Sequence, residues 1–232
     1  MIDETSVPGA ADDLAALPFP PAPSAPTLAS ALAERMKGPG GLYNLGNALG
    51  LAGGLWLAVD ASAGVEGPSL GGAAQAIAAH LAGSGSAAAL TVATLIFFWG
   101  GEVYHRAWAA SPAPDPALNR QGDLLSAGGA LVLGLALALL GHPVLAATAG
   151  LLHALGKLGS ALCPPVRQLV PDWRATWPDP FRSLVLLSRL PAIALALAAI
   201  WDGGSPGGVA EPVLLLACTL IWARADLLLF RA

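Results

Sequence analysis

The sequence predicts an all-α membrane protein, a polytopic bundle of six transmembrane helices. Only 11% of the residues are charged, 55% are hydrophobic, and the mean hydropathy is +0.65. A soluble domain carries about 25% charged residues, so the composition argues against a soluble globule. The apolar residues also gather in blocks, and a membrane-spanning helix needs roughly 20 of them in succession. Six blocks meet this length: 42–60, 87–106, 122–141, 144–162, 184–201 and 212–230.

The charges give a second reason for six spans and also predict their orientation. All 11 Lys and Arg residues fall in or beside the N-terminal tail, the connections between spans two and three and between spans four and five, or the C-terminus. The other connections, near 61–86, 142–143 and 202–211, contain none. Because cytoplasmic loops carry the excess of Lys and Arg, we expect both termini in the cytoplasm and the protein in the cell's inner membrane. Removing one span would destroy this asymmetry.

Residues 1–38 precede the first span and differ from the transmembrane domain at 39–232. They begin acidic and then become rich in proline, a composition that cannot build a packed core. We therefore expect a disordered cytoplasmic tail. Residues 28–37 are expected to form a short juxtamembrane helix, with Thr27 or Ser30 as its N-cap.

The first span and the connection after it each carry a distinct pattern. Gly46, Gly50 and Gly54 recur at every fourth position, and small residues at this spacing let two membrane helices approach closely. We therefore expect a tight helix contact along this stripe. In the long outer connection, the segment Leu70–Ala82 mixes apolar and polar residues, and we expect either a short interfacial helix or a re-entrant element there.

No other segment combines so apolar a run with so dense a cluster of ionisable residues as the stretch from Ala93 to Trp108, which includes most of the second span. It ends in Glu102, His105 and Arg106. Farther along, the sequence His142-Pro143 predicts a very tight outer turn, so spans three and four should form a hairpin. The connection at 166–183 mixes Trp, Arg and Pro, a combination that suits the lipid headgroup region.

The spans also resemble one another. The segment at 42–55 aligns with 118–131 without a gap, and spans two and six align through a shared Thr-Leu-Ile run and a terminal Arg-Ala. The simplest interpretation is three repeated helical hairpins, at 42–108, 118–165 and 183–231, each entering and leaving on the cytoplasmic side. Such repeats are parallel rather than inverted. The matched pairs in the first alignment include Gly46 with Gly122, Asn47 with Asp123, and Gly53 with Gly129.

Short motifs in these hairpins resemble the YrhK-type family of small membrane hairpin proteins. The residues that carry the resemblance are Tyr43-Asn-Leu-Gly-Asn47 with Gly53-Gly54, and Gly156-Lys-Leu-Gly-Ser160 followed by Pro165-Val-Arg167. The resemblance would cover most of the chain, in three copies. It implies a hairpin fold and no established chemistry.

Polar residues within the spans gather in their cytoplasmic third. Ionisable groups inside a membrane usually face the bundle interior, pair with one another and mark function. One interpretation is a polar cavity, open to the cytoplasm, for a small solute or ion. The alternative is that these groups extend to the interface or form structural pairs between helices. The residues are Asn47, Glu102, Asp123, Lys157, Arg189, Arg224 and Asp226.

Histidines raise the possibility of a cofactor, although the sequence itself names none. His105 and His153 lie within spans, and an axial imidazole in an apolar setting is what a haem or chlorin needs. Metal binding is a weaker hypothesis, because Glu102 and His105 share one helical face but no second motif supplies further ligands. The sequence contains no HExxH and no phosphate-binding loop, so we do not expect an enzyme.

Two main classes of function remain. The first is a non-catalytic accessory or assembly factor that packs against other membrane subunits, as the Gly and Ala stripes and the proline-rich tail indicate. The second is a small transporter or channel that uses the cytoplasmic charges. The first is favoured because a pore must be lined by polar groups through its whole depth. The outer half of the predicted bundle consists mainly of Ala, Leu, Gly and Val. With a net charge of −4 and no basic run, nucleic acid is not an expected partner.

Overall fold

A computed structural model describes residues 27–66, 71–72, 75, 79, 84–109, 114–163, 180–204 and 208–230, with backbone alone for 32, 54–66 and 230. Three expected features therefore lie wholly or largely outside the described residues. They are the disordered tail, the interfacial or re-entrant element at Leu70–Ala82, and the Trp- and Arg-rich connection at 166–183.

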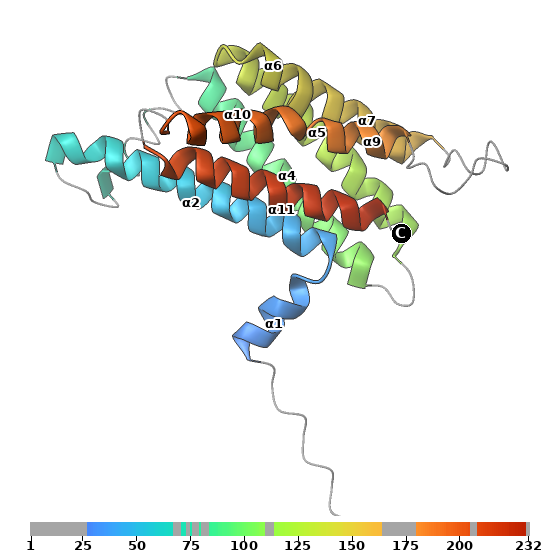
Figure 1. Cartoon of the computed structure of the whole chain (residues 1–232). Coiled ribbons are helices and arrows are strands. Elements are labelled where there is room, and N and C mark those ends of the chain that lie inside the picture. Colours follow the sequence, from blue (N-terminus) through green and yellow to red (C-terminus); the bar gives the residue numbers. More distant parts are fainter. Residues whose placement is uncertain are drawn as a thin grey trace, which may run out of the picture.

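The described residues form helices, which confirms the all-α class (Figure 1). Two of the predicted spans are irregular. The fourth passes through a π-helical stretch, η2, and the fifth is interrupted between α9 and α10. Pro191 explains the interruption, because a proline inside a helix lacks the N–H that the preceding turn needs. The bounds are α1 Leu28–Arg35, α2 Pro39–Glu66, α4 Gly85–Ala109, α5 Pro116–Leu139, α6 Pro143–Leu145, η2 Ala146–Leu152, α7 His153–Leu162, α9 Pro180–Leu187, α10 Leu190–Trp201 and α11 Ala210–Phe230.

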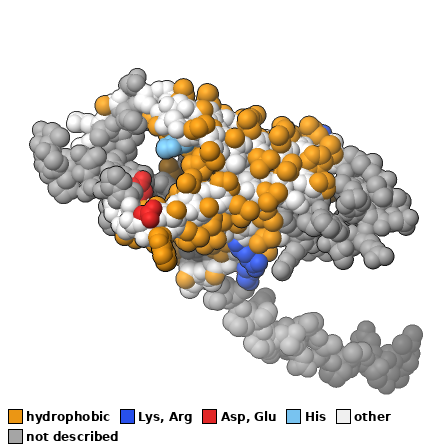
Figure 2. Space-filling view, turned by 45° about the horizontal axis from the view of Figure 1, so that its top comes forward, with side chains coloured by type: hydrophobic (Ala, Val, Ile, Leu, Met, Phe, Trp, Pro, Cys, Tyr) orange, Lys and Arg blue, Asp and Glu red, His pale blue; other side chains and the backbone are white. Residues whose placement is uncertain are grey.

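Five of the helical segments are long and apolar enough to cross a membrane. They correspond to the second to sixth predicted blocks, so the described part of the chain is that of a multi-pass membrane protein. Large apolar side chains point outward along them, and Figure 2 shows one face covered mostly by hydrophobic side chains. The five segments are Gly85–Ala109, Pro116–Leu139, Pro143–Leu162, Pro180–Trp201 and Ala210–Leu229.

The helices pack in a ring that follows the order of the chain. Within the described residues, α2 contacts α4, α4 contacts α5, α5 contacts α7, and α7 contacts α9. The broken helix α9–α10 then packs on α11, and α11 returns to α2, so that the last helix closes the ring on the first. Figure 1 shows these helices running along a common direction, while α1 leaves the bundle at an angle.

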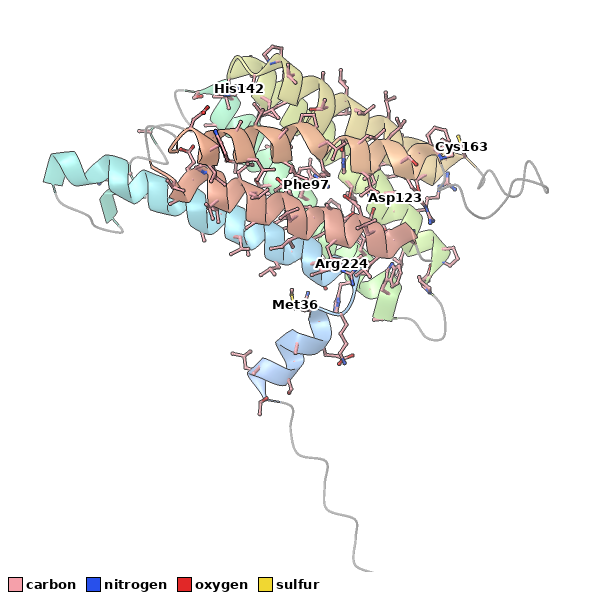
Figure 3. The ribbon with its side chains drawn as sticks, viewed as in Figure 1. Met36, Phe97, Asp123, His142, Cys163 and Arg224 are labelled. Carbon is pink, nitrogen blue, oxygen red and sulfur yellow. The ribbon has the colours of Figure 1, made fainter. Side chains whose placement is uncertain are left out.

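We call one end of this bundle the basic end. There α4, α7 and α11 finish, and α2, α5 and α9 begin. The opposite end holds the turn at His142, where Gly141 adopts a φ of 79° that favours glycine. Figure 3 shows His142 and Cys163 at these two ends, with Asp123 closer to Cys163. Outside the bundle, Thr27 caps the first turn of α1 by accepting a hydrogen bond from the Ser30 backbone N–H at 3.2 Å.

Glycines bring the neighbouring helices close together, but not quite as the sequence predicts. Gly46 packs against the indole of Trp222 and Gly53 against Leu214, so this face of α2 contacts α11. Gly50 faces open space, and the expectation that it joins the contact is wrong. The contacting glycines are therefore seven residues apart, which is close to two helical turns. Gly54, the third member of the predicted stripe, has no described side-chain environment.

A buried polar cluster as the candidate functional site

Every helix of the ring contributes one polar side chain to a common cluster near the basic end. Each of these residues lies within about three helical turns of the helix end from which it comes. Five of them are less than 10% exposed, and the sixth, Arg189, has a side chain that is 12% exposed. We call this group the six-residue cluster. It consists of Tyr43 on α2, Tyr104 on α4, Asp123 on α5, Lys157 on α7, Arg189 between α9 and α10, and Asp226 on α11.

The ammonium group of Lys157 lies at the centre of the cluster. Its Nζ is 3.2 Å from Oδ1 of Asp123 and 3.5 Å from Oδ1 of Asp226. It also donates to the hydroxyl oxygens of Tyr43 at 3.2 Å and Tyr104 at 3.0 Å. Four oxygen atoms therefore surround a group that has three hydrogens to donate, so the buried charge is fully solvated by protein.

The two tyrosines complete the same arrangement from the other side. The Tyr43 hydroxyl donates to Asp226, and the Tyr104 hydroxyl donates to Asp123. Their rings stack with centroids 5.3 Å apart, and Nζ of Lys157 lies 5.4 Å and 5.0 Å from the two centroids. Each phenol therefore acts as a donor to a carboxylate and as an acceptor for the ammonium, which suits a hydroxyl held away from water.

Arg189 adds the second positive charge. Its Nε donates to Oδ2 of Asp226 at 3.1 Å, and its guanidinium carbon lies 5.5 Å from the ring centre of Trp222. Asp226 therefore binds Lys157 through one oxygen and Arg189 through the other. With Asp123, the cluster holds two negative and two positive charges, so it is neutral as a whole. Neutrality is important because an uncompensated charge inside a membrane is expensive.

His153 is buried beside the cluster but belongs to a separate hydrogen-bonded pair. Its Nδ1 lies 3.0 Å from Oγ of Ser188, which in turn donates to the backbone carbonyl of Val185 at 2.6 Å. Ser188 lies at the break between α9 and α10. The pair therefore joins α7 to this break and helps to hold the adjacent Arg189 in place.

Two small cavities border the six-residue cluster. The inner cavity, of about 30 Å³, is lined by residues that include Asn47, Ser126, His153 and Arg189. The end cavity, of about 10 Å³, lies toward the basic end and includes Asn119 among its lining residues. A water molecule needs roughly 10–15 Å³ of such space, so the inner cavity has room for about two water-sized species and the end cavity for one at most.

The structure brings together only part of the residue set that the sequence predicted. Asp123, Lys157, Arg189 and Asp226 meet in the six-residue cluster, and Asn47 lines the inner cavity. Whether they form a functional site stays a prediction. The remaining two predicted members, Glu102 and Arg224, lie elsewhere.

The prediction that Glu102 and Arg224 join this group is wrong. Glu102 is 44% exposed and forms an ion pair with Arg35 of α1, outside the ring. Arg224 is exposed, and Figure 3 shows it on the side of the bundle nearest α1. Each of them lies two positions from a cluster member, and two positions along a helix correspond to roughly 200° of rotation. Both therefore point away from the ring interior.

The structure places the two histidines at different cavities, and whether either of them binds a haem or chlorin stays a prediction. His105 lines a separate cavity beneath α1, together with Trp108, whereas His153 is 2% exposed and bound to Ser188. The inner cavity beside His153 is far too small for a macrocycle. Within the described part of the chain, no group of three or more His, Cys, Asp or Glu side chains is placed to hold a metal ion.

Sequence reasoning missed both tyrosines of the cluster. Tyr104 is absent from the predicted set, and Tyr43 appears only in a short motif. A usable signal is present, since the chain contains just two tyrosines and both occur inside predicted spans beside polar residues. A phenol in that setting needs a hydrogen-bond partner.

These features define the class of protein. It is an all-helical, multi-pass membrane protein whose described helices enclose a neutral, hydrogen-bonded cluster of four charges and two phenols. Comparison with protein-family models, curated proteins and solved structures finds no match.

Proposed function

We propose that this protein is a non-catalytic accessory or assembly factor of the inner membrane, which packs against other membrane subunits. In this proposal the six-residue cluster is a structural lock that fixes the order and spacing of the helices. The protein would thus offer its partners a rigid, apolar surface.

One observation carries this proposal: the four buried charges pair with one another, and the cavities beside them have no room for anything larger than a monatomic ion or one or two waters. Lys157 is surrounded by four oxygen atoms, and the adjoining cavities measure about 30 and 10 Å³. A site for an organic solute would need a larger volume. Polar contacts between membrane helices commonly serve association instead, because an unpaired polar group in lipid is costly.

We further infer that α2 is a sixth span, so that both termini lie on the cytoplasmic side. Its 28 residues exceed the length that a span requires. Its position also supports this inference, because α2 packs along α4 and α11, which are both apolar enough to cross the membrane. The positive-inside rule then assigns the basic end to the cytoplasm.

The proposed three-hairpin repeat has support from matched glycine contacts. Gly46 and Gly53 of α2 pack against α11, the preceding helix of the ring. The aligned Gly122 and Gly129 of α5 pack in the same way against Tyr104 and Phe97 of α4, their own preceding helix. Equivalent glycines therefore make equivalent contacts, as repetition of a YrhK-type hairpin would require.

Purification at native expression level in nanodiscs tests the accessory role. We expect a colourless protein that carries one or more membrane proteins in fixed stoichiometry, measured by absorbance and mass spectrometry. A protein that purifies alone would contradict the role. A preparation that absorbs in the visible range would revive the cofactor hypothesis despite the small cavity.

The second candidate function is transport, and the four buried charges are the observation in its favour. Flux assays in proteoliposomes separate it from the accessory role. If the cluster conducts, Asp123→Asn combined with Lys157→Met should abolish flux in a protein that still folds. If it is a lock, wild-type protein should show no flux above that of empty liposomes.

A further inference from the structure

The inner cavity contains a buried hydrogen-bond donor that has no partner. The side chain of Asn47 is 7% exposed and lines this cavity, and its amide nitrogen Nδ2 donates to no acceptor in the described structure. An unpaired buried donor costs about 1–3 kcal/mol, so such a group usually faces a bound ligand or water. The cavity therefore needs an occupant that accepts a hydrogen bond.

Arg189 supplies further donors to the same space. A guanidinium carries five N–H groups, and within the described residues only Nε of Arg189 has an acceptor, which is Asp226. Arg189 is also the one formally charged residue among the described side chains that line the inner cavity. A guanidinium is weakly hydrated and matches anions well, and the carboxylate that balances it, Asp226, is shared with Lys157, so this end of the cavity favours a negative occupant.

The rest of the lining limits the size and chemistry of this occupant. Phe97, Leu133 and Trp222 provide apolar walls, while Ser126 and Tyr43 provide hydroxyl groups. The volume of about 30 Å³ has room for a monatomic ion or one or two waters, and none for a phosphate ester or a carboxylic acid of any length. A water molecule and a halide would both accept a hydrogen bond from Asn47, and only the halide would add the negative charge that Arg189 attracts.

We propose that the inner cavity binds one small monovalent anion of halide size, held by the Asn47 amide and the Arg189 guanidinium. The ion bridges α2 and the break between α9 and α10, two elements far apart in the chain. It satisfies the orphan donor and adds one more link between helices of the ring. This site goes beyond the accessory role and does not depend on it.

Binding of radiolabelled chloride to the full chain in nanodiscs tests the proposal directly. We expect saturable binding of about one chloride per protein, displaced by bromide and not by gluconate at equal ionic strength. The same halides should raise the thermal unfolding temperature in a saturable manner, as expected for a ligand that binds only the folded state. Absence of saturable, bromide-displaceable binding would mean that water alone fills the cavity and would overturn the proposal.

A charge-changing substitution locates the ion. Asn47→Asp keeps the size of the side chain but places a carboxylate in the cavity, and we expect at least a tenfold loss of chloride affinity. Asn119→Asp is the matched control, because Asn119 lines the end cavity and an aspartate there still accepts from Trp108 Nε1, as Asn119 does at 3.3 Å. Its chloride affinity should match that of wild type.

If Asn47→Asp does not accumulate, Asn47→Ala removes the donor without adding charge and should also weaken binding. Chloride affinity that survives both the loss of the amide and the charge reversal in the cavity would overturn the site. A wild-type protein that binds no halide but still purifies with membrane partners would refute the anion site alone, so the two proposals fail independently.

Discussion

The two halves of the bundle share close backbone contacts, but only one of them holds the polar cluster. At the basic end, a side chain from every helix of the ring enters the six-residue cluster. Backbones approach closely in both halves: a Cβ built on Gly150 of η2 would lie 2.5 Å from Cα of Gly134 on α5, and one built on Gly40 of α2, at the basic end, would lie 2.3 Å from the backbone nitrogen of His105. Lipid tails provide no hydrophobic force between helices, so packing of small residues and polar contacts must hold the helices together.

The difference shows that specificity and proximity are provided separately. Glycine contacts let two helices lie close but do not select a particular partner, since many smooth surfaces fit together. The cluster does select, because Lys157 needs both carboxylates and Asp226 needs both cations. The following substitutions should therefore affect the two halves unequally.

The largest effect is expected for Lys157→Met. Removal of the ammonium leaves Asp123 and Asp226 with only one cation between them, and breaking a buried ion pair in this way costs about 3–5 kcal/mol. Unfolding titrations with sodium dodecyl sulfate in mixed micelles should show this loss. Adding Asp123→Asn restores neutrality and should recover much of it. A single variant as stable as wild type would contradict the structural lock.

In the opposite half, Gly134→Ala should cost about 1–3 kcal/mol, because its new methyl carbon would lie 2.9 Å from Cα of Gly150 and force the helices apart. Gly128→Ala is the matched control on the same helix, since nothing lies within 4 Å of that position. The control should unfold like wild type. Equal effects of the two substitutions would show that the helices are not in close contact at Gly134.

Tyr104→Phe should destabilise the basic end even though it removes only one oxygen atom. Asp123 loses a donor and Lys157 loses an acceptor, at an expected cost of about 1–3 kcal/mol. Thr91→Val offers a comparison on the same helix, because the Thr91 hydroxyl donates only within α4, to the Ala87 carbonyl at 3.0 Å. In the same micelle titration, the tyrosine variant should be clearly less stable than the threonine variant. The reverse order of stability would refute the assigned role of the phenol.

The smallest effect is expected for Glu102→Gln. Its ion pair with Arg35 is 44% exposed on both sides, and exposed pairs contribute about 1 kcal/mol or less. The same carboxylate-to-amide change at Asp226 should be several times more damaging, because that residue is 1% exposed and binds two cations. If both changes had equal effects on unfolding, burial would not distinguish the two acidic residues.

Much of the fold could be predicted from the sequence, because five of the predicted blocks coincide with apolar helices of spanning length. Asp123, Lys157 and Asp226 were also found, since charged residues in such blocks usually turn inward. Glu102 and Arg224 could have been separated from these residues by their angular position around the helix. The prediction grouped residues only by their depth in the membrane. The partners of the tyrosines were beyond prediction because they depend on which helices are neighbours in the ring.

Gly50 illustrates the same limit in the fold. Its spacing from Gly46 suits a close contact, but a helix of 3.6 residues per turn rotates by about 40° over four residues. Whether that rotation leaves Gly50 inside or outside a contact depends on the crossing angle with α11. The crossing angle is a tertiary property that a repeat of glycines does not reveal.

Closure of the ring by α11 has a consequence for biogenesis. Tyr43 and Asp226, which share a hydrogen bond, are separated by 183 residues in the chain. During synthesis, α2 therefore lacks this contact until α11 has been made. Until α11 enters the bilayer, Lys157 and Arg189 have a single carboxylate between them. A chain that lacks α11 therefore carries one unbalanced positive charge inside the membrane, so insertion of the last helix is a condition for a neutral bundle interior.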